Sequence, residues 1–125
     1  LHGTGGDEVG AVELARAIAP ARFGVVAMRG NEPEGGLNRW FRRLAEGVFD
    51  VPNLLSRTEE LADWTIVNVE GPRIALGFSN GANVAAAALL LRPETFDAAI
   101  LLAPMVPFEP ESLPVLDGKP IFMLC

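Results

Sequence analysis

Cysteine and histidine are scarce in this chain of 125 residues, which contains one of each. A lone cysteine rules out an internal disulfide and suits a reducing compartment, so we expect a cytoplasmic protein. Cysteine, histidine and carboxylate residues nowhere occur together at the spacing of metal ligands, and we expect neither a metal nor another cofactor. The sequence also lacks internal repeats and low-complexity linkers.

Positive charge is in short supply as well, because 10 lysines and arginines face 16 acidic residues. The resulting net charge of -6 and pI near 4.7 argue against nucleic acid as a partner, which would require a basic surface. The longest apolar run, residues 82–91, falls well short of the roughly 20 residues of a membrane span. We therefore expect a buried helix there, within one domain that can form its own core.

What the sequence does contain is a serine, Ser79, placed between Gly77 and Gly81 where an apolar strand gives way to an apolar helix. A serine hydroxyl attacks a carbonyl well when a sharp turn presents it beside a base and beside N–H groups that face the developing oxyanion. Strand and helix come very close at such a turn, so the flanking positions must be nearly free of side chain. The pattern predicts a nucleophile elbow; the alternative is a tight junction with a helix-capping serine.

A second glycine-rich stretch opens the chain, where His2 is followed by glycines at positions 3, 5 and 6. It is not a phosphate-binding loop, because no Gly-Lys-Ser/Thr follows, and a dinucleotide-binding pattern would need glycine in place of Glu8. A His-Gly loop can instead supply one N–H of an oxyanion hole, with the residue after the nucleophile supplying the other. The two donors would be the N–H groups of Thr4 and Asn80.

Apolar strands alternate with helices along the rest of the chain, which predicts a parallel sheet covered on both faces. Helix starts are indicated by Asp7 and Asp50, and β-branched residues at 65–69 suggest that the second helix frays or becomes extended there. The expected strands are residues 23–28, 73–78, 98–103 and 119–125, and the expected helices begin near residues 7, 50 and 80.

Residues 30–50 form an insertion of about 20 residues, where connections of 2–6 are usual. Aromatic and cationic side chains alternate within it around Trp40 and Phe41. Two interpretations remain open at this point. The aromatics line a pocket in which an arginine meets an anionic group, or they pack on the domain from a short surface helix with solvated arginines.

Residues 1–7, 28–31, 41–50 and 77–83 together resemble the bacterial phospholipase/carboxylesterase branch of the α/β-hydrolase superfamily. The chain is similar in particular to small cofactor-independent esterases of hydroquinone- or dienelactone-type metabolism. The resemblance implies a three-layer α/β-hydrolase fold with a mostly parallel central sheet. It also implies Ser79 as nucleophile and the N–H groups of Thr4 and Asn80 as oxyanion hole. His2 matches a histidine that supports the oxyanion loop and does not accept the proton.

The family's acidic residue and catalytic histidine follow the strand that ends here at Cys125, and neither is present. Residues 1–125 are therefore expected to be a partial α/β-hydrolase domain, truncated at both ends and inactive alone. A strand should precede Leu1. Beyond Cys125 we expect an Asp within roughly ten residues, then a helix, a strand and a His.

The resulting hypothesis is a serine hydrolase that acts on small-molecule carboxylic esters through an acyl-enzyme intermediate. Two alternatives stay open. One is a thioesterase or amidase on the same scaffold, and the other is a non-catalytic α/β-hydrolase-like module that only binds a ligand.

Overall fold

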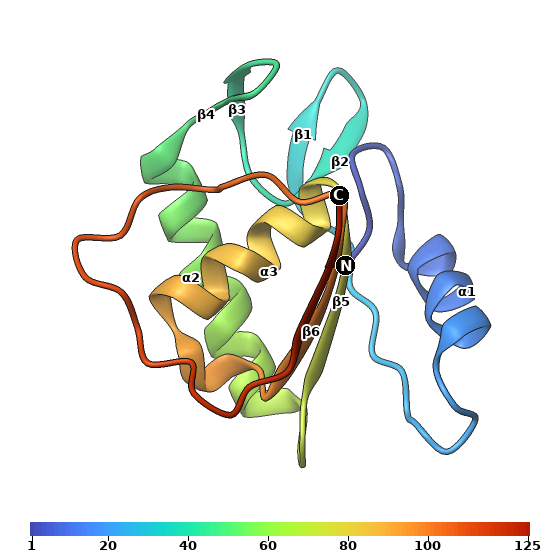
Figure 1. The fold of residues 1–125 in the computed structure, drawn as a ribbon. Coiled ribbons are helices and arrows are strands. Elements are labelled where there is room, and N and C mark those ends of the chain that lie inside the picture. Colours follow the sequence, from blue (N-terminus) through green and yellow to red (C-terminus); the bar gives the residue numbers. More distant parts are fainter.

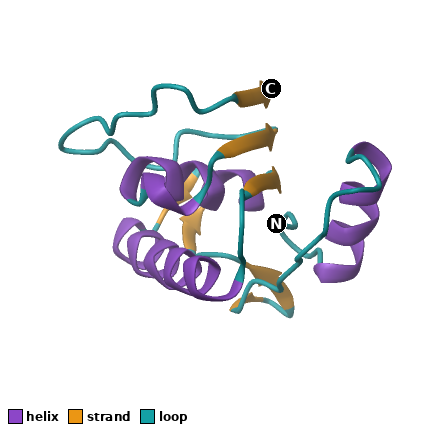
Figure 2. Ribbon diagram, turned by 90° about the horizontal axis from the view of Figure 1, so that it is seen from below, coloured by secondary structure: helices purple, strands orange, loops and turns teal.

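The computed structural model describes residues 1–125 and shows a parallel sheet with helices on both faces (Figure 1). Helices α2 and α3 cover one face and α1 lies on the other, an arrangement also visible from below (Figure 2). This confirms the predicted three-layer α/β-hydrolase fold in fragment form. The sheet has the order β5 (Ile74–Phe78), β6 (Ala98–Leu102) and β7 (Ile121–Leu124), with both pairs parallel.

The helices are α1 (Glu8–Ile18), α2 (Val51–Asn68) and α3 (Asn80–Leu91), followed by the 3-10 turn η1 (Pro93–Thr95). Both acidic caps act as predicted, since Asp7 accepts the N–H of Gly10 at 3.0 Å and Asp50 that of Asn53 at 3.2 Å. The expected fraying at 65–69 is wrong. Helix α2 continues to Asn68 because Thr65 is buried, so tertiary packing outweighs the low helix propensity of β-branched residues. None of these helices has the length and apolarity needed to cross a bilayer.

The strand expected at residues 23–28 does not form. The segment is extended (light blue in Figure 1) but pairs with no other strand, and a cavity of about 150 Å³ lies between it and β5. At this edge of β5, the carbonyl of Leu1 accepts the backbone N–H of Phe78 at 3.2 Å. Apolar composition indicated a buried strand, but a strand also needs a neighbour for its N–H and C=O groups.

The insertion at residues 30–50 contains two small hairpins and no helix, so the surface helix of the second interpretation is wrong. Turn glycines with positive φ explain the difference: Gly35 (55°) and Gly36 (83°) join the first pair, and Gly47 (72°) the second. The hairpins are β1 (Glu32–Glu34) with β2 (Leu37–Arg39) and β3 (Arg43–Ala45) with β4 (Val48–Phe49).

Two apolar clusters hold the layers together. One lies between α3 and the sheet and is built largely of alanines, which allow the helix to approach the strands closely. The other fixes the insertion to α2 and α3 through Trp40 and Phe41. Phe41 is fully buried and meets the ring of Phe49 edge-on, with centroids 5.0 Å apart. Phe41 is therefore a core residue and not a pocket wall.

We expect Phe41→Ala to lower the free energy of unfolding by about 3–5 kcal/mol, because it removes a fully buried ring and leaves a cavity. Leu44→Ala is the matched control, since Leu44 lies in the same insertion but is 69% exposed. Urea denaturation followed by circular dichroism measures both. Similar small losses in the two variants would contradict the assignment of Phe41 to the core.

Candidate active site

Ser79 sits in the single step between β5 and α3 with φ 51° and ψ -113°. Its N–H donates to the carbonyl of Leu102 in β6 at 2.8 Å, and its own carbonyl accepts the N–H of Asn83 at 2.9 Å. A non-glycine residue at positive φ costs on the order of 1–3 kcal/mol and persists only where the surroundings impose it. This strained turn is the geometry that the spacing of Gly77 and Gly81 predicts for a nucleophile elbow.

The two flanking glycines are required by backbone contacts. A Cβ on Gly77 would stand 2.6 Å from the carbonyl oxygen of Gly81 and 2.7 Å from Cα of Ala82. A Cβ on Gly81 would overlap the carbonyl groups of Leu1 and His2. The obstacles are main-chain atoms, which cannot rotate aside. Strand β5 and helix α3 therefore touch at Gly77, and α3 and the opening loop touch at Gly81.

The opening loop lies against the elbow. A Cβ on Gly3 would stand 2.9 Å from the ring of Phe78, the residue before the serine. The Thr4 N–H takes part in no backbone hydrogen bond, and Asn80 is the first residue of α3, whose opening N–H groups have no partner within the helix. The opening loop therefore contacts the elbow, and the N–H groups of the two predicted oxyanion donors are available.

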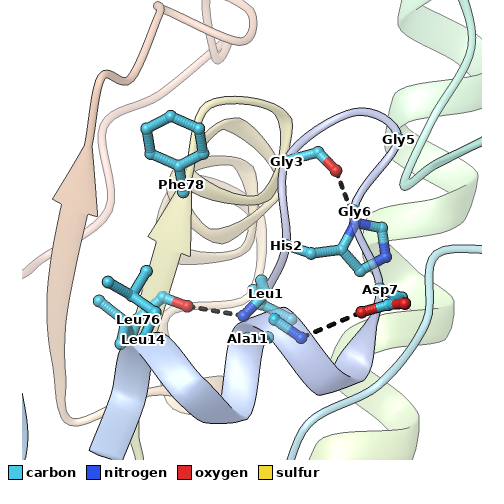
Figure 3. A pocket seen from close by; sticks show the side chains of 11 residues that line it. Leu1, His2, Gly3, Gly5, Gly6, Asp7, Ala11, Leu14, Leu76 and Phe78 are labelled. Atoms are coloured by element: carbon cyan, nitrogen blue, oxygen red, sulfur yellow. Dashed lines mark hydrogen bonds between the residues drawn. The ribbon is translucent and has the colours of Figure 1, made fainter. Parts of the chain in front are cut away.

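His2 cannot serve as the base for Ser79. It is 5% exposed, and its Nε2 accepts the N–H of Gly30 at 2.8 Å. Its Nδ1 lies 2.7 Å from the carbonyl of Gly3, so Nδ1 carries the ring proton and donates it (Figure 3). Both ring nitrogens are occupied in holding the loop. Residues 1–125 contain no further histidine, so they provide the predicted nucleophile and oxyanion donors without an imidazole base.

Two side-chain contacts at this site were not predicted from the sequence. Asn80, expected to contribute only its N–H, also accepts the backbone N–H of Trp40 through Oδ1 at 2.7 Å. Arg39, which one of the two interpretations left solvated, is 3% exposed and donates from Nη1 to Oγ1 of Thr4 at 2.6 Å. Burial, followed by the nearby charge of Arg43, holds the pKa of the Arg39 guanidinium below its usual range.

A cavity of about 280 Å³ lies between the opening loop, α1 and β5 (Figure 3). The loop glycines and the apolar side chains of Leu14, Leu76 and Phe78 line it. Ser79 does not take part in the lining. We therefore place the candidate active site on the elbow itself, at the end of β5, and not in this cavity.

A parallel sheet between helices, with a strained serine where the strand turns directly into a helix, defines the α/β-hydrolase class. The family model described as "Serine aminopeptidase, S33" matches residues 1–123. The chain belongs to this hydrolase family, and similarity to solved carboxylesterases confirms the predicted carboxylesterase-type resemblance.

Curated and solved relatives match almost the whole chain. MhqD of Bacillus subtilis (strain 168), named as a hydrolase, is 43% identical over 129 residues, covering 98% of this chain and 64% of MhqD. The Bacillus cereus carboxylesterase structure is 40% identical with a TM-score of 0.93, covering 98% of this chain and 60% of its own. The Mesorhizobium loti carboxylesterase structure is 35% identical with a TM-score of 0.86, covering 98% and 61%. The chain thus spans less than two thirds of each relative's length.

We expect Gly77→Ala to destabilise the protein by on the order of 3 kcal/mol, because the new methyl group meets main-chain atoms of α3 at 2.6–2.7 Å. Gly24→Ala is the control, since nothing lies within 4 Å of the Cβ it would add. Its stability should stay within about 0.5 kcal/mol of the parent. Thermal and urea unfolding check both; equal stabilities would show that the elbow is not closely packed.

Proposed function

We propose that the full-length protein is a serine hydrolase that cleaves small-molecule carboxylic esters, with Ser79 as its nucleophile. The observation that carries the proposal is the strained conformation of Ser79, φ 51°, on a turn packed against an opening loop in which the Thr4 N–H forms no backbone hydrogen bond. A structural capping serine has no need of this conformation, and the Ser79 side chain makes no capping hydrogen bond to α3. With a single cysteine that calls for no disulfide, we assign the activity to the cytoplasm.

In the proposed reaction, Oγ of Ser79 attacks the ester carbonyl carbon while its proton passes to a histidine base. The carbonyl π electrons move onto oxygen, and the N–H groups of Thr4 and Asn80 stabilise the oxyanion. Collapse of this intermediate breaks the bond to the alcohol oxygen, which receives the proton from the histidine. Water then repeats the sequence on the acyl-enzyme and releases the carboxylic acid.

The base must come from another part of the protein, because both nitrogens of His2 are engaged. We propose that an Asp and a His beyond Cys125 complete the triad, in the chain order serine, acid, histidine of this fold. Residues 1–125 are then a partial domain without turnover of their own. A native sequence lacking these two residues would favour the ligand-binding alternative.

Esters are preferred over amides or thioesters in this proposal because two similar solved structures are named carboxylesterases. The family description names an aminopeptidase, which cleaves an amide bond, so an amidase on the same scaffold is the alternative. Steady-state kinetics on a p-nitrophenyl ester and the p-nitroanilide of the same acid separate the two. A higher kcat/KM for the anilide would overturn the ester assignment.

Treating the full-length protein with a fluorophosphonate probe should label Ser79, and Ser79→Ala should abolish both labelling and p-nitrophenyl ester hydrolysis. Ser56→Ala and Ser112→Ala are the controls, because these are the other serines of the chain and neither lies at an elbow. Peptide mass spectrometry identifies the labelled residue. Labelling of Ser56 or Ser112 in place of Ser79 would contradict the nucleophile assignment, and an unlabelled, inactive parent would favour the binding module.

Thr4→Pro should lower kcat by about 10²–10³-fold, the loss expected when one oxyanion donor is removed, because proline has no N–H. Thr4→Ser keeps both the N–H and the hydroxyl and should retain most of the activity. Kinetics on folded, probe-titrated enzyme measure the difference. Equal activities of the two variants would exclude Thr4 N–H as a donor.

A further inference from the structure

Arg39 differs from the other arginines of the insertion. Arg42 and Arg43 are ion-paired with Asp50 and Glu34 at the surface. Arg39 is 3% exposed and forms no salt bridge, yet its guanidinium is fixed by two hydrogen bonds, from Nε to the carbonyl of Phe41 at 3.0 Å and from Nη1 to Oγ1 of Thr4 at 2.6 Å. Burying a guanidinium without a counter-ion is costly, so the contacts it keeps call for an explanation.

Thr4 is the one residue with a side chain in the run from position 3 to position 6, where the other three residues are glycines. Glycines give the loop access to many backbone conformations, and Gly5 already has a positive φ of 77°. Backbone hydrogen bonds hold the loop after Thr4, from the Gly5 N–H to the carbonyl of Asn38 and from the Gly6 N–H to the carbonyl of Gly3, both at 3.0 Å. At Thr4 itself, the hydrogen bond from Arg39 to the hydroxyl is the only one, since neither the N–H nor the carbonyl of Thr4 forms one.

The residue after Arg39 anchors the same backbone to both sides of the site. The N–H of Trp40 donates to Oδ1 of Asn80 at 2.7 Å, and its Nε1 donates to the carbonyl of His2 at 2.9 Å. The Trp40 and His2 rings lie 5.1 Å apart. Arg39 is thus carried on a segment tied to the elbow through Asn80 and to the loop through His2.

We propose that Arg39 is a positioning residue, whose bond to the Thr4 hydroxyl sets the direction of the Thr4 N–H relative to the elbow. The inference rests on the proposed function, in which that N–H stabilises the oxyanion. Arginine suits this task because its planar fork reaches the Phe41 carbonyl and the Thr4 hydroxyl simultaneously. A lysine has one nitrogen on a flexible stem and cannot reproduce the pair of contacts.

Arg39→Met in the full-length enzyme should lower kcat for a p-nitrophenyl ester by about 10²-fold, the loss expected from misplacing a catalytic group by about 1 Å. KM should change by no more than about twofold, because the N–H binds the transition state and not the ester ground state. Arg43→Met is the matched control, since Arg43 pairs with Glu34 and touches neither Thr4 nor the elbow. Its kcat should equal that of the parent.

Thr4→Val tests the same bond from the other side and keeps the Arg39 side chain in place. It should lower kcat about as much as Arg39→Met, and the double variant should lose little more than either single one, because one interaction is removed in each case. Thr4→Ser restores the hydroxyl and should restore kcat. These comparisons stand even if Arg39→Met folds poorly.

Rates are expressed per active site, counted by fluorophosphonate labelling of Ser79 in each variant. An active parent with unchanged kcat in Thr4→Val, or a raised KM with kcat preserved, would overturn the positioning role and leave the serine hydrolase intact. A fall in melting temperature without a fall in kcat would likewise overturn it. An inactive, unlabelled parent would instead overturn the proposed function.

Discussion

The close approach of main chains at the elbow governs the rest of this structure. The carbonyls of Leu1 and His2 occupy the space where a side chain of residue 81 would lie, and α3 occupies the space beside residue 77. Helix, strand and loop therefore meet at one point with no side chains between them. This contact fixes the opening loop against the turn that carries Ser79.

The local parts of the fold were predictable because their signals are local. Glycines two positions either side of Ser79, followed by an alanine-rich run, indicated the elbow and a helix over 80–91, which the structure confirms. The segment at 23–28 was not predictable in the same way, since its state depends on which strand lies beside it. The hairpins of the insertion had turn glycines, but one of the two interpretations of the aromatic and cationic residues around Trp40 was a short surface helix.

The supporting contacts of the candidate site could not be predicted from the sequence, for a different reason. Asn80 and Trp40 are 40 positions apart and Thr4 and Arg39 are 35 apart, and neither pair forms a recognisable spacing. A buried arginine looks like any surface arginine in a sequence. For His2 the resemblance supplied a role in supporting the loop, and its two hydrogen bonds give that role a physical basis.

Helix α3 also has an electrostatic consequence. Its sequence from Asn80 to Leu91 carries no charged side chain, and its first residues are buried, so little screens its dipole at that end. A helix of this kind places roughly half a positive charge at its N-terminus. Here that terminus follows Ser79 directly. A negative charge at this position would therefore be stabilised by the N-terminus of α3.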